Sequence, residues 1–153
     1  MLSEACKLLE QKIRSEIPVA GQMGLRVAGY ESGTLTIEAA LEPNINVHGT
    51  AFGGSLYSIA ALTGWGLIYL RLQEVGINPN IVIVGGDVKY QLPVTEKIVA
   101  RSTLSDVDFS RFLQTYKRKG IARMTQSVNI VTGQGVAMTL AGRYVQASKE
   151  SHK

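Results

Sequence analysis

The sequence predicts an α+β fold in which a curled antiparallel sheet of five or six strands wraps around one long central helix. Residues 53–74 form a run of helix length that is apolar on nearly all sides and carries no charge before Arg71. Two short strand-like segments precede this run, and longer ones follow it. A helix that is apolar all round has to be buried, and a surrounding sheet can bury it.

One amphipathic helix and one hairpin are expected before the long helix. Leucines and isoleucines at helical spacing follow Ser3, which can cap the helix, and Pro18 ends it. Residues 25–30 and 34–41 are strand candidates on either side of a turn at residues 31–33. Apolar and polar residues alternate in the second candidate, which is typical of a strand with one buried face.

After the long helix, the sequence predicts further strands and one short helix. Gly76 is the expected C-terminal cap of the long helix. Segments rich in Val and Ile predict four strands, at residues 81–92, 98–104, 122–132 and 135–146. Gly85 and Gly86 indicate a bulge or a close backbone approach in the first of these strands. Asp106 or Asp108 is expected to cap the short helix.

Size and hydropathy favour one globular domain over a membrane protein. The 153 residues suit a single domain, and the mean hydropathy is only +0.09. The apolar run is long enough to span a bilayer, but glycines and serines dilute it and no cluster of Lys or Arg flanks it. The single cysteine, Cys6, fits a reducing compartment, so we expect a cytoplasmic protein. No signal peptide is expected, because residues 1–9 are amphipathic and carry Glu4 and Lys7.

The start of the long helix is the first candidate for chemistry. Gly53 and Gly54 stand where the backbone N–H groups of a helix have no partner within the helix. Such groups, together with the helix dipole, stabilise an oxygen atom that becomes negative during a reaction. The alternative interpretation is that the two glycines only let the loop turn and the helix pack.

Three polar residues have both a catalytic and a structural interpretation. Asn46 either binds a carbonyl group or water, or braces its own loop. His48 is either a base, since imidazole titrates near neutral pH, or a loop histidine bonded to the backbone. Asp87 is the only acidic residue in its apolar strand. It either supplies a catalytic carboxylate, across a dimer if needed, or pairs with Lys89 on the same face of the strand.

The basic residues give a weaker indication of partners. The net charge is +4 and the pI is about 9.3. Residues 117–119, together with Arg123, form a basic patch that either meets phosphate groups or is a solvated face. Nucleic-acid binding is not expected, because the basic residues are scattered and no recognition motif is present. The two histidines, His48 and His152, are too few to predict a metal site.

Several motifs give the chain a resemblance to a known family. They are HGTAFGGSLY at residues 48–57, GWG at 64–66, YQLPV at 90–94, KG at 119–120, AR at 122–123 and GRYV at 142–145. With these motifs, the chain from about residue 2 to residue 146 resembles the YiiD C-terminal family of thioesterases, in the hot-dog fold superfamily. The combination of FGGSLY with GWG is the most specific part of the resemblance.

The resemblance implies a homodimer, or a dimer of dimers, with substrate clefts at the dimer interface near the start of each long helix. The implied substrates are acyl thioesters of coenzyme A or of an acyl-carrier protein, with no cofactor besides this coenzyme A. The residues expected to act in catalysis are Asn46, His48, Gly53, Gly54 and Asp87. The residues expected to contact the substrate are Phe52, Ser55, Tyr57, Tyr90, Lys119 and Arg123.

The chain departs from the phenylacetate-type hot-dog thioesterases at two positions. That type carries a histidine where this chain has Phe52, and an acidic residue on the helix where this chain has Ala61. The leading hypothesis is a thioesterase. The alternatives are a non-catalytic acyl-CoA-binding or regulatory protein, which Ala61 favours, and a hydratase or dehydratase that uses His48 with Asp87. A homodimer is also expected because residues 81–92 would make a long, apolar and poorly protected sheet edge.

Overall fold

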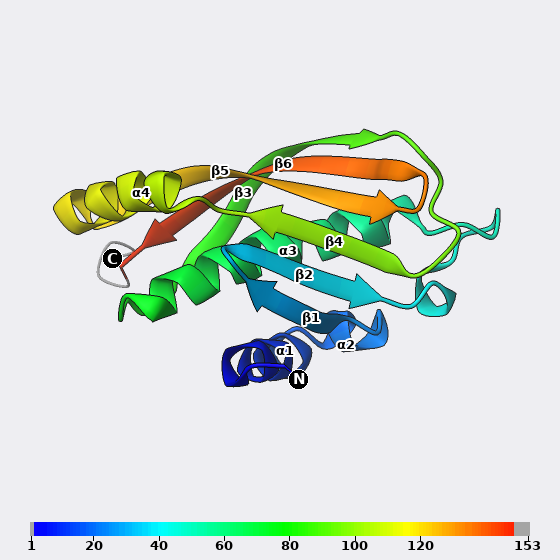
Figure 1. Ribbon diagram of the computed structural model, residues 1–153, viewed down its shortest axis with the longest axis horizontal. Coiled ribbons are helices and arrows are strands. Elements are labelled where there is room, and N and C mark those ends of the chain that lie inside the picture. The colour runs from blue at the N-terminus through cyan, green and yellow to red at the C-terminus, as the bar shows by residue number, and fades with distance from the viewer. Residues whose placement is uncertain (1, 149–153) are drawn as a thin grey trace.

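The computed structural model describes residues 2–148, so the tail expected at residues 149–153 lies outside the described residues. Figure 1 shows the elements in their order along the chain, which is the predicted order with one helix added. They are α1 (Glu4–Glu16), α2 (Pro18–Gln22), β1 (Arg26–Glu31), β2 (Thr34–Ala39), a 3₁₀ turn (Glu42–Asn44), α3 (Gly53–Glu74), β3 (Ile81–Tyr90), β4 (Ile98–Thr103), α4 (Asp106–Lys119), β5 (Ile121–Thr132) and β6 (Gly135–Ala147).

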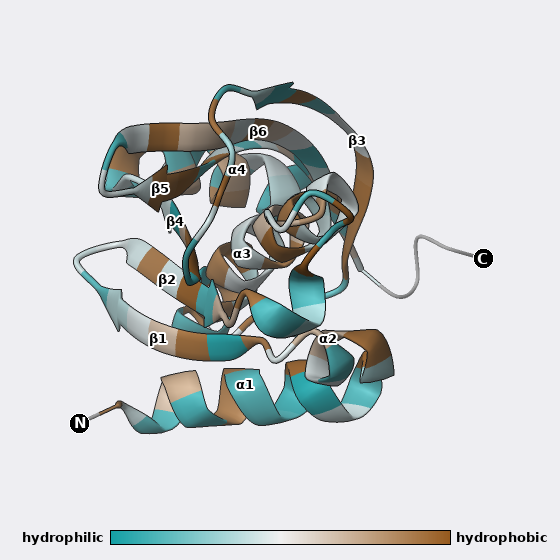
Figure 2. Ribbon diagram, turned by 90° about the vertical axis from the view of Figure 1, so that its right-hand side faces the viewer, coloured by the Kyte–Doolittle hydropathy of each residue, from teal (hydrophilic) through white to brown (hydrophobic). Residues whose placement is uncertain are grey.

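The strands form one six-stranded sheet in the order β1-β2-β4-β5-β6-β3, and all neighbouring strands are antiparallel. The sheet curls, and α3 lies in its hollow, as Figures 1 and 2 show. The register of β3 shifts between Ile83 and Gly85, where the paired glycines predict a bulge. The predicted fold class, a curled sheet around a long central helix, is confirmed.

The central helix α3 begins and ends where the apolar run predicts. Leu67 and Ile68 in its middle are fully buried. Gly66 leaves room for neighbours, since a Cβ there would lie 3.0 Å from Leu35 of β2 and 3.2 Å from Leu9 of α1. Within residues 2–148, no helix has the length and hydropathy needed to cross a membrane.

Two local predictions are wrong in detail. Pro18 ends α1, but it also begins a second helix, α2, because a proline in the first turn of a helix sacrifices no hydrogen bond. The cap of α4 is Ser105, whose Oγ accepts the N–H of Asp108 at 3.1 Å, and not Asp106 or Asp108. The two aspartates lie in the first turn, where their charge is favourable to the helix dipole.

The two edges of the sheet differ in how they are protected. At β1, the Glu10 carboxylate of α1 accepts the N–H of Val27 at 2.8 Å, so the helix covers part of this edge. At β3, Val82, Ile83 and Val84 are 51%, 40% and 56% exposed. A largely apolar strand of 10 residues, at an edge where no other strand among residues 2–148 pairs with it, is a surface on which another strand can pair.

Tyr144 of β6 fills a slot between α3 and the sheet, and two glycines make the slot. A Cβ at Gly64 would overlap the Tyr144 hydroxyl and lie 2.8 Å from Cζ, and one at Gly142 would lie 2.8 Å from Cε2. The hydroxyl donates to the carbonyl of Ala61 at 2.7 Å. Burial raises the pKa of Tyr144, so the hydroxyl stays protonated and remains a donor at neutral pH.

Candidate functional site

The start of α3 presents three backbone N–H groups that form no hydrogen bond within residues 2–148. The first bond of the helix runs from the N–H of Leu56 to the carbonyl of Phe52, at 3.1 Å. Phe52 holds the cap position, and no side chain accepts a hydrogen bond there. The N–H groups of Gly53, Gly54 and Ser55 are therefore free, at the positive end of the helix dipole.

A cavity of about 330 Å³ opens beside Gly53, the first of these three residues. Tyr90, the last residue of β3, forms one wall, because its Oη donates to the carbonyl of Gly53 at 2.9 Å. Burial raises the pKa of Tyr90, so this hydroxyl stays protonated at neutral pH. The remaining lining is mostly apolar and consists of Ala51, Leu56, Gln91, Leu92, Pro93 and Val94. The cavity thus suits an apolar group next to the N–H donors.

The ring of Phe52 lies against the helix start. A Cβ at Gly54 would lie 2.5 Å from its Cε2 and 2.9 Å from its Cζ, so the glycine makes room for the ring. Phe52 is 56% exposed, because its outer face meets no other part of the described chain. The phenylalanine found at the position of the phenylacetate-type histidine therefore borders the donors with an apolar surface and brings no titratable group.

The side chain of Asn46 holds together the loop that leads into α3. Its Oδ1 accepts the N–H of His48 at 2.9 Å and the N–H of Thr50 at 3.1 Å. Its Nδ2 donates to the Oγ1 of Thr50 at 3.0 Å and to the carbonyl of Ala51 at 3.4 Å. Both ends of the amide are thus in use, which supports the interpretation that Asn46 braces its loop.

His48 belongs to the same loop, which projects from the end of the molecule where α3 begins (Figure 1). The residue is exposed, and its neighbour Val47 is 95% exposed. Its backbone N–H is held by Asn46, whereas its imidazole forms no hydrogen bond to any residue the structure describes. The ring is therefore free to meet a substrate or another subunit.

Asp87 lies on the opposite face of the sheet from α3. The preceding residue, Gly86, faces the helix, because a Cβ there would lie 2.8 Å from the Oη of Tyr57. Side chains alternate along a strand, so Asp87 points to the convex face. There its carboxylate pairs with Arg143 of β6 at 3.1 Å, and not with Lys89. The structure does not bring Asp87 to the other candidate catalytic residues of its own chain.

The basic patch lies far from the start of α3. Lys119 is the last residue of α4, which lies at the other end of the molecule (Figure 1). Arg123 and Arg111 line a cavity of about 360 Å³ between α4 and β5. With 22 residues, α3 is about 33 Å long, so one chain keeps this patch well away from the N–H donors.

Ala61, at the position of the missing acid, has tyrosines as neighbours. Its carbonyl accepts the hydroxyl of Tyr144, and Tyr57 lies one helical turn earlier. The sequence alone does not point to Tyr144 as a neighbour of the site, although the GRYV motif at residues 142–145 contains it. The groups that the structure places along this half of α3 are neutral donors, the N–H groups and the tyrosine hydroxyls.

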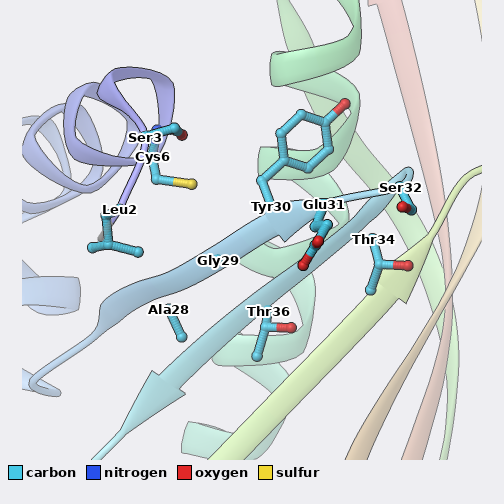
Figure 3. Close-up of a pocket in the computed structure, with 10 residues that line it drawn as sticks. All are labelled: Leu2, Ser3, Cys6, Ala28, Gly29, Tyr30, Glu31, Ser32, Thr34 and Thr36. Atoms are coloured by element: carbon cyan, nitrogen blue, oxygen red, sulfur yellow. The ribbon is translucent and has the colours of Figure 1, made fainter.

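A larger cavity, of about 670 Å³, lies between α1 and the β1–β2 hairpin (Figure 3). It is near the C-terminal end of α3, since Tyr30 in its wall donates a hydrogen bond to Glu74. Another wall residue, Thr34, shares a hydrogen bond with Thr103 at 2.7 Å. Because these polar groups are bonded within the protein and lie far from the N–H donors, we do not assign this cavity to the site.

Comparison with known proteins identifies the family and the fold of the chain. The model of a family described as "Putative thioesterase (yiiD_Cterm)" matches residues 6–148. A crystal structure of a protein of unknown function from Chlorobaculum tepidum TLS is 33% identical, with a TM-score of 0.89 and 94% of each chain covered. The crystal structure of "the putative thioesterase from Shewanella oneidensis" is 30% identical, with a TM-score of 0.87, and covers 95% of this chain and 99% of that chain.

The fold extends to more distant proteins. A thioesterase from Haemophilus influenzae is 15% identical, with a TM-score of 0.70 over 94% of this chain and 90% of that chain, and shares the hot-dog fold. The fold implied by the sequence motifs is therefore confirmed. Since the family model matches nearly the whole chain, the protein belongs to the YiiD C-terminal family of thioesterases.

Proposed function

We propose that this protein hydrolyses acyl thioesters of coenzyme A or of an acyl-carrier protein. The observation that carries the proposal is the set of three free N–H groups at the start of α3, beside a mostly apolar cavity. When water attacks a thioester carbonyl, the oxygen becomes negative, and N–H groups at a helix start stabilise it. The C–S bond of the intermediate then breaks, and the leaving thiolate takes up a proton.

The activation of water is assigned to His48. Its imidazole is exposed on the loop that enters α3, and Asn46 fixes the backbone of that loop. An imidazole can take a proton from water as the water attacks. Asp87 is the second candidate, but it would have to act on the site of another subunit, because its strand turns it away from its own α3.

His48→Ala is expected to lower kcat by about 10²-fold or more and to leave acyl-CoA binding intact, because a general base contributes on that scale. Asp87→Asn is the matched variant and is expected to keep kcat near the parental value. Steady-state release of the thiol product measures both, with thermal melting as the check of folding. A loss in Asp87→Asn alone would assign the base to the carboxylate, and a loss in neither would remove both residues from the mechanism.

The proposed enzyme is a homodimer, alone or as part of a dimer of dimers, with its cleft at the subunit interface. The uncovered edge of β3 supports this assembly, since pairing two β3 strands would bury its exposed apolar residues. The same strand ends at Tyr90, which contacts Gly53. A partner that pairs with β3 therefore comes close to the start of α3.

Such a dimer also gives the basic patch a role. Antiparallel pairing of two β3 strands about a two-fold axis lays opposite ends of the two subunits side by side. Lys119 and Arg123 of one subunit then lie toward the start of α3 of the other, where they contact the phosphates of coenzyme A. Charged hydrogen bonds from Lys and Arg to phosphate are strong and suit this contact.

Val84→Lys is expected to give a monomer without thioesterase activity, because a charge on the apolar edge opposes pairing. Val107→Lys on α4 is the matched control, since Val107 is 61% exposed and Val84 56%. Light scattering at micromolar concentration should find a dimer for the parent and for Val107→Lys. A parent that is a stable monomer would contradict the proposed assembly.

A non-catalytic acyl-CoA-binding protein is the second candidate, and Ala61 favours it because the usual helix carboxylate is replaced. A screen of acyl-CoA substrates over a range of chain lengths separates the two functions. We expect hydrolysis of at least one substrate. Binding of an acyl-CoA, measured by calorimetry, without hydrolysis of any of them would establish the non-catalytic function instead.

A further inference from the structure

We propose that the hydroxyl of Tyr57 is a second hydrogen-bond donor to the thioester oxygen, beside the N–H groups at the start of α3. The inference rests on the proposed hydrolysis and gives Tyr57 a catalytic role. The hydroxyl keeps its proton throughout and donates a hydrogen bond while water adds to the carbonyl. The step therefore needs no further reactant besides the thioester and water.

The position of Tyr57 on α3 directs its side chain to the helix start. Tyr57 follows Gly53 by four residues and Gly54 by three, and these spacings place residues on one face of a helix. Helical side chains lean toward the N-terminus, which favours the turn of the two glycines over the later turns of α3 as the place that a ligand of Tyr57 occupies. After burial, Tyr57 is the next cause that raises the pKa of both Tyr90 and Tyr144, so its hydroxyl interacts with each of these side chains.

Gly86 of β3 fixes the hydroxyl from the opposite side. A Cβ at this glycine would lie 2.8 Å from the Oη of Tyr57 and 3.0 Å from the Cδ1 of Leu140. The hydroxyl thus occupies space that exists only because position 86 has no side chain. The strand thereby sets where the donor stands between α3 and the edge of the sheet.

The hydroxyl of Tyr57 is also free to donate. Its two tyrosine neighbours use theirs within the protein, since Tyr90 donates to Gly53 and Tyr144 to Ala61. Tyr57 is half-buried, and its Oη has no hydrogen-bond partner among residues 2–148. A partly buried hydroxyl without a protein partner gains from binding a ligand oxygen.

The alanine at position 61 keeps this donor available. Ala61 lies four residues after Tyr57, a spacing at which side chains of a helix meet. A carboxylate at that position, as in the phenylacetate-type enzymes, would place a charged acceptor on the same face of the helix as Tyr57. The side chain of Ala61 has no acceptor, so it leaves the hydroxyl of Tyr57 without a hydrogen bond to this position.

Tyr57→Phe tests the proposal, because it removes the hydroxyl and keeps the ring. Loss of one donor to a developing oxyanion lowers kcat by about 10²-fold, and KM should change little. Tyr116→Phe on α4 is the control, since Tyr116 is also half-buried but lies on another element. Hydrolysis of the best acyl-CoA from the substrate screen is measured for each variant, and thermal melting checks the fold.

A double-mutant cycle with Gly86→Ala tests the placement. The new Cβ displaces the hydroxyl, so Gly86→Ala should lower kcat in the parent but have little further effect in the Tyr57→Phe chain. Gly29→Ala on β1 is the control, because nothing lies within 4 Å of a Cβ there. If the two losses simply multiply, Gly86 does not act through the hydroxyl, and the proposed placement is wrong.

The outcomes separate this inference from the function on which it rests. An active parent whose Tyr57→Phe variant keeps the parental kcat overturns the role of Tyr57 and leaves the thioesterase in place. A rise in KM with kcat unchanged also overturns it, because the hydroxyl would then bind ground state and transition state alike. A parent that hydrolyses no acyl-CoA in the screen overturns the proposed function and this inference together.

Discussion

Gly54→Pro is expected to lower kcat for thioester hydrolysis by about 10²–10³-fold, the usual effect of removing one oxyanion donor. Proline has no N–H, and Gly54 is the second residue of α3, where that N–H forms no bond within the helix. Proline is tolerated in the first turn of a helix, so the fold and the dimer should persist. Thiol release from an acyl-CoA measures the loss.

Gly54→Ala separates the lost donor from the added bulk. It keeps the N–H but places a Cβ 2.5 Å from Cε2 of Phe52, so the ring has to move in this variant as well. We expect Gly54→Ala to retain much more activity than Gly54→Pro. Equal losses in the two variants would show that the position of Phe52 matters and that the Gly54 N–H does not.

Gly64→Ala is expected to destabilise the fold by about 1–3 kcal/mol, the usual cost of overpacking a core. The new methyl group would overlap the hydroxyl of Tyr144, a rigid side chain that is 1% exposed and held by the carbonyl of Ala61. For a chain of this size, each kcal/mol lowers Tm by about 2–4 °C. Thermal and urea unfolding measure the change.

Tyr144→Phe tests whether the overlap with the tyrosine hydroxyl causes the loss of stability in Gly64→Ala. It removes the nearest of the atoms that the new methyl group would overlap, although Cζ at 2.8 Å remains, so the double variant should be more stable than the sum of the two single losses predicts. Gly133→Ala is the control, since a Cβ at Gly133 meets nothing within 4 Å. Additive losses would show that the alanine acts on something other than the tyrosine.

Local patterns in the sequence predict most of the secondary structure. The apolar run predicts the bounds of α3, and alternation predicts β2, because both signals come from residues close together in the chain. The helix α2 is not predicted, because it has only five residues and because Pro18, which begins it, is also a signal for the end of the preceding helix. The cap of α4 is Ser105 instead of Asp106 or Asp108, because all three residues lie within one turn and each can accept a hydrogen bond at a helix start.

Some features of the candidate site can likewise be predicted from the sequence, and others cannot. The glycines at the helix start are readable from sequence, because free N–H groups follow from where a helix begins. The partner of Asp87 is not, since Arg143 is 56 residues away and reaches it only through the pairing of β3 with β6. The hydrogen bond between Tyr144 and Ala61 cannot be predicted from the sequence either, because the two residues are 83 positions apart.

The sequence by itself thus determined the α+β class, the central helix, its donor-bearing start and the family to which the chain belongs. Only the tertiary structure decided that Asp87 faces away from α3 and that the Tyr57 hydroxyl lies against Gly86. The physical reason is that periodicity and capping act over a few neighbouring residues. Strand order and the face that a side chain occupies depend instead on pairings between distant segments.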